Sequence, residues 1–416
     1  MTLLSVDDAR SRILSHFEPV GTETLPLAEC VRRVLAANVT AQNNLPSFDN
    51  SSMDGFAVIA SDLGEAAPAS PRTLEVVADI PAGTSPDVTL VRGQAARIMT
   101  GAPMPQGADA VIPVEETDFD QRAPGTPAPK TVAVFKSLKA GDYVRAQGTD
   151  VQTGQPVLKA GHKLRPQDLG LLAMLGVAEV PVHGRPRVAL LSSGDELIPV
   201  DEPLRPGKIR DSNTYTLAAL IDNAGAEAIR LGIAADRREA VEALLANAAA
   251  QKVDLILSSA GVSVGAFDFI KDVVEAQGEL TFWRVNMRPG KPLAFGRFKN
   301  IPFIGLPGNP VSAFVGFEVF VRPALERLSG LEAGGTQKGT SRPRVRVRLA
   351  EDISSDGRES YLRASVNEEG GILSAHLAGH QGSGNLLSIV QANALLIIPA
   401  GVKSLAAGME VDAWLL

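Results

Sequence analysis

Strand-like and helix-like segments alternate after Arg187, and this alternation constrains the fold more than any other feature of the chain. Each apolar run has the length of a buried strand, and the segments between the runs have helical composition. We expect strands at 188–192, 228–231 and 253–257 and helices at 213–224 and 237–250. Because a strand–helix–strand unit joins parallel neighbours, this order predicts a parallel sheet with helices on both faces.

Further segments should complete this α/β domain. Strands are expected near 293–298 and 301–305, and a long apolar helix should run from Pro310 to about Leu328. In such sheets the ligand binds beyond the carboxyl ends of the strands, so the segments that follow each strand are candidate site residues.

Two helices are expected before the α/β domain. Ser5 and Asp8 resemble a helix-capping pair, so residues 5–18 should form an amphipathic helix. A second, short helix is expected at 27–36. This second helix would place Cys30, the one cysteine of the chain, at an apolar position, which favours a packed thiol over a nucleophile.

The remaining sequence has a different character. Short strand-like runs separated by Gly and Pro clusters fill residues 56–144, which predicts a small all-β domain. Residues 329–343 have the composition of a linker, and alternating apolar positions after Val345 predict a C-terminal β domain. A chain of 416 residues is too long for one ordinary core, so roughly two to four domains are expected.

The composition excludes several kinds of partner and site. The net charge of −7 provides no basic field for nucleic acid or an anionic membrane. No stretch approaches the ~20 apolar residues that span a bilayer, and no signal pattern opens the chain, so we expect a cytoplasmic protein. A single cysteine excludes an internal disulfide and a cysteine-based zinc site, and the histidines lack paired ligand spacing.

Small and polar residues follow the first and third strands of the α/β domain. After the first strand, Ser193 and Gly194 allow a tight turn, and the carboxylates of Asp195 and Glu196 could hold Mg²⁺ or accept sugar hydroxyls, or could simply begin a helix. The segment from Ser258 to Asp268 exposes backbone N–H groups suited to an oxyanion. It lacks the ending of a Walker loop, and its length favours a functional loop over a turn capped by Asp268.

Three cations follow within eight positions, at Arg284, Arg288 and Lys291. Pro and Gly residues stiffen their loop, which favours anion binding over a solvated surface. The segment 307–310 then turns a strand into a helix whose N-terminus should point into the same crevice. These features together indicate an enzyme that acts on a phosphorylated small molecule.

Two patches outside the α/β domain are unusual in composition. Residues 47–56 crowd polar side chains between Phe48 and Phe56, and residues 98–105 end a predicted strand in a rigid turn. Taken alone, both patches are explained as structural turns.

Six motifs together resemble those of the MoeA family of molybdopterin molybdenumtransferases, to which the C-terminal domain of gephyrin is similar. One motif would be weak, but six in family order across nearly the whole chain make the resemblance specific. The motifs are Phe48–Phe56, Met99–Pro103, Ser193–Leu197, Gly261–Gly265, Pro289–Pro292 and Leu306–Pro310.

The resemblance implies a fold of α/β plus all-β subdomains. The central α/β domain, of the molybdopterin-binding type, would span 184–330. The other parts would be an elongated domain from 1–50 and 147–183, an inserted β domain at 51–146, and a C-terminal β-barrel at 338–416. It also implies an elongated homodimer, with the active site between the α/β domain of one subunit and the inserted domain of the other.

The resemblance implies a transferase of molybdenum cofactor biosynthesis. The family takes adenylylated molybdopterin and molybdate, hydrolyses the adenylyl phosphoanhydride with Mg²⁺, and places molybdenum on the dithiolene sulfurs to give molybdenum cofactor and AMP. Small molecules are therefore the expected ligands, with transient contacts to molybdopterin adenylyltransferase and apo-molybdoenzymes. Neither nucleic acid nor a membrane is an expected partner.

The resemblance also assigns site residues, position by position. The expected catalytic residues are Asp54, Thr100, Asp150, Glu196, Asp236 and Asp268, of which Glu196 and Asp268 would bind Mg²⁺. The expected substrate-binding residues are Ser193, Gly194, Ser259, Gly261, Ser263, Gly265, Arg284, Arg288, Lys291, Pro307, Asn309, Pro310, Arg363 and Ser383. The family often has Lys at the positions of Arg284 and Arg288, and Arg keeps the charge but changes the hydrogen-bond geometry.

Three other functions fit parts of the sequence. A molybdopterin adenylyltransferase resembles the α/β domain but is a compact single domain, whereas this chain carries further β-rich segments. A non-catalytic scaffold could discard the acidic residues that are present here. A generic sugar-phosphate or nucleotide-binding protein would not require the patches at 47–56 and 98–105.

Overall fold

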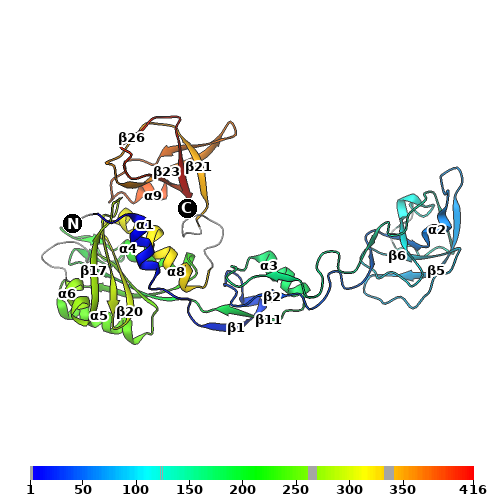
Figure 1. The fold of residues 1–416 in the computed structure, drawn as a ribbon, viewed down its shortest axis with the longest axis horizontal. Helices are drawn as coiled ribbons and strands as arrows, with labels where there is room; N and C mark the ends of the chain where they lie inside the picture. The colour runs from blue at the N-terminus through cyan, green and yellow to red at the C-terminus, as the bar shows by residue number, and fades with distance from the viewer. Residues whose placement is uncertain (1–2, 122, 124, 261–268, 332–341) are drawn as a thin grey trace. The chain divides into compact units, whose positions relative to one another are not determined.

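The computed structural model describes residues 3–121, 123, 125–260, 269–331 and 342–416. The chain divides into two compact units, drawn in Figure 1. The first unit contains Met1–Ala37, Ala160–Leu169 and Glu179–Leu416, and the second contains Asn38–Lys159 and Gly170–Ala178. Along the sequence, the second unit therefore consists of two segments, each inserted within the first unit.

A six-stranded sheet forms the centre of the first unit, in the order β15-β12-β16-β20-β19-β17. The first four strands in this order pair parallel with one another, which confirms the predicted parallel α/β sheet. The strands are β12 (Arg187–Ser193), β15 (Glu227–Ala234), β16 (Leu255–Ser259), β17 (Gly278–Arg284), β19 (Pro292–Phe298) and β20 (Ile301–Leu306).

The far edge of this sheet is antiparallel, which the sequence did not predict. β19 pairs antiparallel with both β20 and β17. Lys299 and Asn300 join β19 to β20 with φ values of 46° and 68°, and a two-residue turn with positive φ matches the twist of an antiparallel pair. The strand β17 was missed because it follows α6 (Phe269–Gln277) without any intervening run of turn residues.

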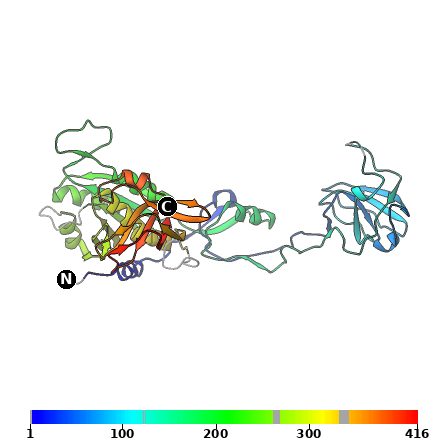
Figure 2. The same ribbon diagram turned by 90° about the horizontal axis from the view of Figure 1, so that it is seen from above.

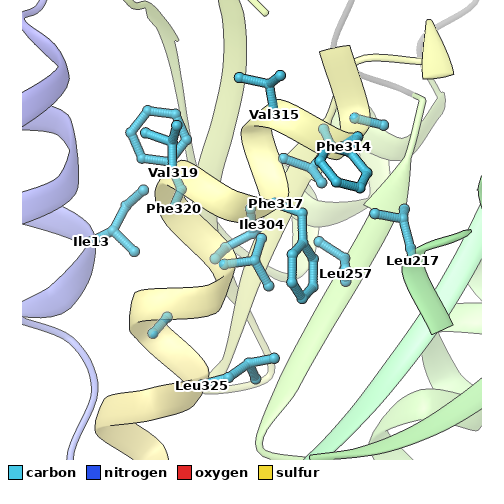
Figure 3. Close-up of a cluster of buried hydrophobic side chains, with 14 of the residues drawn as sticks. Ile13, Leu217, Leu257, Ile304, Phe314, Val315, Phe317, Val319, Phe320 and Leu325 are labelled. Carbon is cyan, nitrogen blue, oxygen red and sulfur yellow. The ribbon is translucent and has the colours of Figure 1, made fainter. Parts of the chain in front are cut away.

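Helices cover both faces of the sheet. The helices α1 (Val6–Leu14), α4 (Asn213–Asn223) and the segment after β20 pack on one face, and α5 (Arg238–Ala250) and α6 pack on the other. Side chains of each strand alternate between the two cores: Leu257 faces the first core and Ile256 the second. Figure 3 shows Leu257 in the first core with Phe317 and other large apolar side chains.

The predicted helix from Pro310 to Leu328 is continuous but irregular. It consists of α7 (Pro310–Gly316), a π-helical turn η3 (Phe317–Val321) and α8 (Arg322–Leu328). Pro323 has no N–H to donate to the carbonyl of Val319, and its ring crowds that carbonyl, so the helix widens at this point. The widened turn carries Glu318, which is fully buried.

The first N-terminal helix is confirmed. α1 (Val6–Leu14) begins after Ser5, whose hydroxyl accepts a hydrogen bond from the Asp8 backbone N at 3.1 Å. The helix ends at Leu14, before the predicted end at residue 18.

The predicted helix at 27–36 is wrong. A single 3-10 turn, Leu27–Glu29, ends before Arg32 takes a φ of 66°, and Leu35 forms a β-bridge with Val182. Backbone pairing therefore overrides the local helical pattern. Cys30 is nevertheless buried, and burial raises the pKa of its thiol, which confirms the packed thiol.

The C-terminal part of the first unit is a closed barrel of five strands. Around the barrel the order is β23-β24-β21-β27-β25, and β25 pairs back to β23. This confirms the predicted C-terminal β-barrel. The strands are β21 (Arg344–Leu349), β23 (Glu359–Glu369), β24 (Ile372–Leu377), β25 (Ala394–Ile398) and β27 (Glu410–Leu415).

A five-stranded sheet forms the main part of the second unit, in the order β7-β4-β6-β5-β8, drawn in blue to cyan in Figure 2. Its strands confirm the all-β prediction for residues 56–144. They are β4 (Gly55–Val58), β5 (Arg72–Ile80), β6 (Gln94–Ile98), β7 (Ala110–Pro113) and β8 (Thr131–Val134). No helix in the described ranges is long and apolar enough to cross a bilayer.

Candidate active site

The carboxyl ends of the parallel strands bring several predicted residues together. Ser259 at the end of β16 pairs in register with Ser192 of β12 on one side and Leu306 of β20 on the other. Segments that follow three different strands therefore meet at one edge of the sheet. A crevice of about 360 Å³ opens there, and its lining includes the predicted residues Ser193, Glu196, Ser259, Asn309 and Pro310.

The loop after β16 begins in a strained conformation. Ala260 has a φ of 98°, which side-chain-bearing residues rarely adopt. Its backbone N donates to the Leu306 carbonyl at 3.0 Å, and its own carbonyl accepts from the Ser258 hydroxyl at 2.9 Å. Strain of this kind is common where a loop serves a function. The next predicted residues, Gly261, Ser263, Gly265 and Asp268, lie outside the described residues.

Asn213 was missed by the sequence analysis, although it holds the crevice together. Its side-chain amide donates to the Ser259 hydroxyl at 2.7 Å and to the Gly308 carbonyl at 2.8 Å. Asn213 opens α4 and thus ties the ends of β16 and β20 to that helix. The polar run Arg210-Asp211-Ser212-Asn213 just before an amphipathic helix was a signal that could have identified it.

Asp211 was also missed by the sequence analysis, and its hydrogen bonds fix the end of β12. Its carboxylate accepts from the backbone N and the hydroxyl of Thr214, at 3.0 and 2.6 Å. The Thr214 hydroxyl lies 3.0 Å from the hydroxyl of Ser192, and all three side chains are buried. This satisfied polar chain keeps the strand end rigid beneath the crevice.

Three carboxylates gather beside the crevice. Asp195 and Asp236 exchange backbone-to-carboxylate hydrogen bonds, at 3.3 and 3.1 Å. Burial, and then the charges of Asp195 and Glu196, raise the pKa of Asp236. Gly194, at a φ of 147°, lets the Glu196 carboxylate fold over its backbone. The site is thus locally negative, and its predicted residues Gly194, Glu196 and Asp236 lie together.

Hard carboxylate oxygens are the ligands that Mg²⁺ prefers. Burial, and then the nearby charges of Asp195 and Glu196, disfavour the ionised form of Asp236 and raise its pKa, and a bound cation would favour that ionised form. Among the residues that the structure describes, no three His, Cys, Asp or Glu side chains are already arranged around a metal position. The donor chemistry fits Mg²⁺, and the second predicted ligand, Asp268, belongs to the segment that is not described.

The predicted cations lie at the same sheet edge. Because β19 runs antiparallel to β20, the start of β19 and the end of β17 lie beside the carboxyl end of β20. Arg284 ends β17 and Lys291 precedes β19, with the Val285 N to Lys291 O hydrogen bond closing the loop at 2.8 Å. Within the described residues, neither these two nor Arg288 forms a salt bridge, which leaves three cations available to an anion.

Arg363 is placed differently from the other predicted cations, because it is fully buried in the barrel. Its guanidinium donates to the Ser388 hydroxyl at 3.0 Å and to the carbonyls of His380 and Gly382. Burial, and then the charge of Arg288, lower its pKa to about 10. The guanidinium therefore organises the loop at 380–388 and adds to the positive potential near Arg288.

Ser383 belongs to the loop that Arg363 organises. Its carbonyl accepts a hydrogen bond from the backbone N of Val311 at 3.0 Å, in the first turn of α7. This bond joins the barrel loop to the segment Pro307–Pro310, so the predicted Ser383, Asn309 and Pro310 are neighbours in the first unit.

The other three predicted residues lie in the second unit. Asp54 and Thr100 are hydrogen-bonded to each other. Asp150 forms a salt bridge with Arg145, and its backbone N donates to the Leu45 carbonyl at 2.9 Å. The sequence patches at 47–56 and 98–105 therefore form one local structure.

Comparison with known families agrees with this architecture. The MoeA N-terminal region (domains I and II) matches residues 4–176. A probable molybdopterin-binding domain matches residues 189–327, and the MoeA C-terminal region (domain IV) matches residues 346–416. The three matches cover most of both described units.

Individual relatives match over nearly their whole length. A molybdopterin molybdenumtransferase from Nostoc sp. is 40% identical over 396 residues, 94% of this chain and 88% of the relative. The protein of that name from Haemophilus influenzae is 37% identical over 98% of both chains. A solved structure of the molybdopterin biosynthesis MoeA protein from Pyrococcus horikoshii OT3 has a TM-score of 0.83 and 29% identity over 100% of both chains.

The parallel sheet with its carboxyl-edge crevice, the closed barrel and the inserted β unit define an enzyme of the transferase class built around a molybdopterin-binding type of domain. The chain belongs to the MoeA family of molybdopterin molybdenumtransferases.

Proposed function

We propose that this enzyme transfers molybdenum from molybdate to adenylylated molybdopterin, with Mg²⁺-dependent hydrolysis to molybdenum cofactor and AMP. The observation that carries the proposal is the arrangement of charge along one sheet edge. Carboxylates of Asp195, Glu196 and Asp236 lie at the β12 and β15 ends, and the three cations at positions 284, 288 and 291 lie at the β17 and β19 end. This order of charges matches a substrate whose diphosphate carries a bound metal at the acidic end and whose oxyanion partner lies at the cationic end.

The proposed roles follow from the chemistry of each side chain. Arg284, Arg288 and Lys291 hold the tetrahedral oxyanion, with Arg363 and Ser383 shaping the loop beside them. Charge-assisted hydrogen bonds from guanidinium and ammonium groups are the strongest that a protein offers to an oxyanion. The cations therefore concentrate molybdate where the dithiolene sulfurs must lie.

The acidic end of the crevice binds the diphosphate region. Glu196 and Asp268 would hold Mg²⁺, which supplies charge stabilisation when the phosphoanhydride P–O bond breaks and AMP leaves. Asp236 adds negative charge that favours the cation. Water supplies the oxygen that completes the second phosphate, and its proton passes to a nearby carboxylate or to solvent.

The remaining predicted residues orient the substrate. Ser193 and Ser259 offer hydroxyls to it, and the segment Pro307–Pro310 offers the backbone at the start of α7. The small residues Gly194, Gly261, Ser263 and Gly265 would let the diphosphate approach backbone N–H groups.

We further propose the domain boundaries that the family resemblance implies. The α/β domain spans 184–330 and the barrel 338–416, and residues 51–146 form an insertion within the domain built from 1–50 and 147–183. In a homodimer, Asp54, Thr100 and Asp150 of one subunit would complete the α/β site of the other. We place the enzyme in the cytoplasm, with transient contacts to molybdopterin adenylyltransferase and to apo-molybdoenzymes.

The proposal is tested by incubating the purified protein with adenylylated molybdopterin, Mg²⁺ and molybdate. We expect molybdate-dependent AMP release together with reconstitution of an apo-molybdoenzyme. Arg288→Ala combined with Lys291→Ala should raise the molybdate concentration needed for half-maximal AMP release. Arg92→Ala, which removes an exposed cation of the second unit, is the control and should change nothing. AMP release that does not depend on molybdate would contradict the proposal.

A further inference from the structure

The backbone of the loop at 284–291, here called the cation loop, is held by the C-terminal barrel. Within it lies the short strand β18 (Met287–Arg288), which pairs parallel with the start of β23 in the barrel. The backbone N of Glu359 donates to the Asn286 carbonyl at 3.1 Å. The barrel sheet therefore continues into the cation loop, and barrel residues can fix how this loop presents its cations.

Arg358, just before β23, makes a side-chain contact with the same loop. Its guanidinium Nη1 donates to the Met287 carbonyl at 3.1 Å. This carbonyl belongs to the planar peptide group that joins Met287 to Arg288. Because the group is planar, a hydrogen bond to its oxygen also restricts the backbone N of Arg288, and hence the direction in which the Arg288 side chain leaves the loop.

The Arg358 guanidinium is itself held by Asp356. The Asp356 carboxylate accepts from the Arg358 backbone N at 3.1 Å, from Nε at 2.9 Å and from Nη2. Gly357, at a φ of 85°, makes the turn that brings the two side chains together. Since Nε and Nη2 are bonded to the carboxylate, the rigid fork of the guanidinium directs Nη1 to the Met287 carbonyl.

The charge of Asp356 also reaches Arg288. The hydrogen bond from Arg358 holds the pKa of Asp356 below its ordinary value, and the charge of Arg288 adds to this effect. Arg363 has the opposite relation, because burial, and then the charge of Arg288, lower its pKa. Arg288 therefore has one attractive and one repulsive neighbour in the barrel. Among the described residues it forms no salt bridge, so its N–H groups remain available to a ligand.

We infer that Asp356 and Arg358 are positioning residues for the transfer reaction. Asp356 orients the Arg358 guanidinium, and Arg358 fixes the Met287 carbonyl. The fixed carbonyl in turn holds Arg288 in the direction from which it binds the oxyanion. Neither Asp356 nor Arg358 touches the substrate in this role. The inference rests on the proposed function for the identity of that oxyanion, which is molybdate.

A purely structural ion pair is the alternative role for these two residues, and the barrel offers a matched comparison in Arg344 and Asp412. The side chains of that pair are 30% and 27% exposed, against 28% and 37% for Arg358 and Asp356. In the described part of the chain, the Arg344 guanidinium donates to Asp412 and reaches no carbonyl of the cation loop. A structural role therefore predicts similar effects when either arginine is removed.

The test measures AMP release by the full chain at varied molybdate, with adenylylated molybdopterin and Mg²⁺ saturating. We expect Arg358→Ala to raise the KM for molybdate about tenfold, the scale of one hydrogen bond to a charged group. The KM for adenylylated molybdopterin should not change. Asp356→Asn, which keeps the side-chain size, should raise the KM for molybdate by a smaller factor. Arg344→Ala is the control and should keep the parental KM.

A double variant distinguishes positioning from a general loss of structure. If Arg358 acts through Arg288, Arg358→Ala should add no further rise in the KM for molybdate when Arg288→Ala is also present. The thermal midpoints of Arg358→Ala and Arg344→Ala should differ little, since both remove partly exposed ion pairs. Should Arg358→Ala not fold, Asp356→Asn is measured with and without Arg288→Ala by the same criteria.

Two results would overturn the inference. The first is a parental KM for molybdate in Arg358→Ala. The second is a rise in this KM by the same factor with and without the Arg288 guanidinium, because Arg358 would then act on another part of the site.

The inference and the proposed function can fail separately, because calorimetric binding of molybdate to the same variants needs no turnover. Molybdate-dependent AMP release by the parent, with a parental KM in Arg358→Ala, would overturn only the positioning role. Molybdate binding that Arg358→Ala weakens only while Arg288 is present, without any molybdate-dependent turnover, would support the positioning role and overturn the proposed transfer reaction.

Discussion

Asp54 accepts two hydrogen bonds at one carboxylate oxygen from Thr100, from its backbone N at 2.8 Å and from its hydroxyl at 2.7 Å. The next residue, Gly55, must lack a side chain, because a Cβ there would lie 1.9 Å from the Ile112 carbonyl oxygen of the neighbouring strand. Gly101, at a φ of 80°, donates to the Ser51 carbonyl at 2.8 Å. The Asp54 carboxylate is thus held in one orientation by two loops that are distant in sequence.

Replacing the Thr100 hydroxyl tests whether this orientation serves catalysis. Thr100→Val removes one of the two hydrogen bonds and keeps the side-chain shape. We expect a loss in kcat/KM for AMP release of about tenfold, the scale of one hydrogen bond to a charged group. Thr100→Ser should retain activity. Since both side chains are exposed, the thermal midpoint should change little in either variant. An unchanged kcat/KM in Thr100→Val would show that catalysis does not depend on the orientation of the Asp54 carboxylate.

A shared active site predicts complementation between inactive variants. Asp54→Ala changes the second unit and Lys291→Ala changes the first, so each homodimer should be defective at both sites. A mixed dimer contains one site with both changes and one site with neither. Random assortment into two-fold dimers should restore about a quarter of parental AMP release. This is checked by measuring AMP release after the two variants are refolded together or co-expressed. Each variant alone is the control. Activity no higher than that of the separate variants would place each site within one subunit.

Asp236→Asn should make the protein more stable and less active. Burial, and then the charges of Asp195 and Glu196, raise the pKa of Asp236. A carboxyl group whose pKa is raised by folding binds more protons in the native state, so its contribution to stability is lost as pH rises through the folded pKa. The amide of Asp236→Asn does not ionise, so at neutral pH the variant does not lose this contribution to the free energy of unfolding. We expect a higher thermal midpoint for the variant and a smaller midpoint rise on adding Mg²⁺.

Asp222→Asn is the matched control for this experiment. Asp222 is an exposed carboxylate on α4. Its amide variant should keep the parental midpoint and the parental response to Mg²⁺. A lower midpoint in Asp236→Asn than in the parent would show that the carboxylate is needed for folding rather than for binding a cation.

Sequence patterns identified the α/β core because burial on both faces leaves an unmistakable signal. The segment at 253–257 is apolar except at Asp254, and its apolar residues are divided between the two helix-covered cores. The helix predicted at 27–36 was wrong because the structure of this segment depends on a partner that is distant in sequence. Its local pattern is helical, but Leu35 pairs with Val182, a partner nearly 150 positions away, and local periodicity carries no information about such a partner.

The candidate site divides in a similar way. Glycines and cations in loops stiffened by Gly and Pro, such as Gly194 and Lys291, could be identified as site residues from the sequence, because few purely structural turns need this combination of residues. Asn213 was missed because its role depends on the Ser259 hydroxyl and the Gly308 carbonyl, which meet it only in three dimensions.

A buried ion triad ties the start of the barrel to the widened helix, and it predicts acid sensitivity. Glu318 is fully buried and receives two hydrogen bonds each from Arg322 (2.6 and 2.8 Å) and Arg342 (3.0 and 2.9 Å). Burial raises the pKa of Glu318, but the hydrogen bonds from the two arginines outweigh it and hold the pKa below its ordinary value.

Because the folded pKa of Glu318 lies below the unfolded one, about 4.3, its stabilisation is present above that pH and is lost as pH falls toward the folded pKa. Glu318→Gln should cost about 3–5 kcal/mol near neutral pH, since the buried Arg322 and the partly buried Arg342 lose the carboxylate that they share. Between about pH 5 and pH 3 the parent should lose more of its urea midpoint than the variant does. Arg344→Ala, which breaks a solvent-exposed pair with Asp412, should cost less than about 1 kcal/mol. Equal costs for the two variants would mean that the triad contributes no more than a surface ion pair.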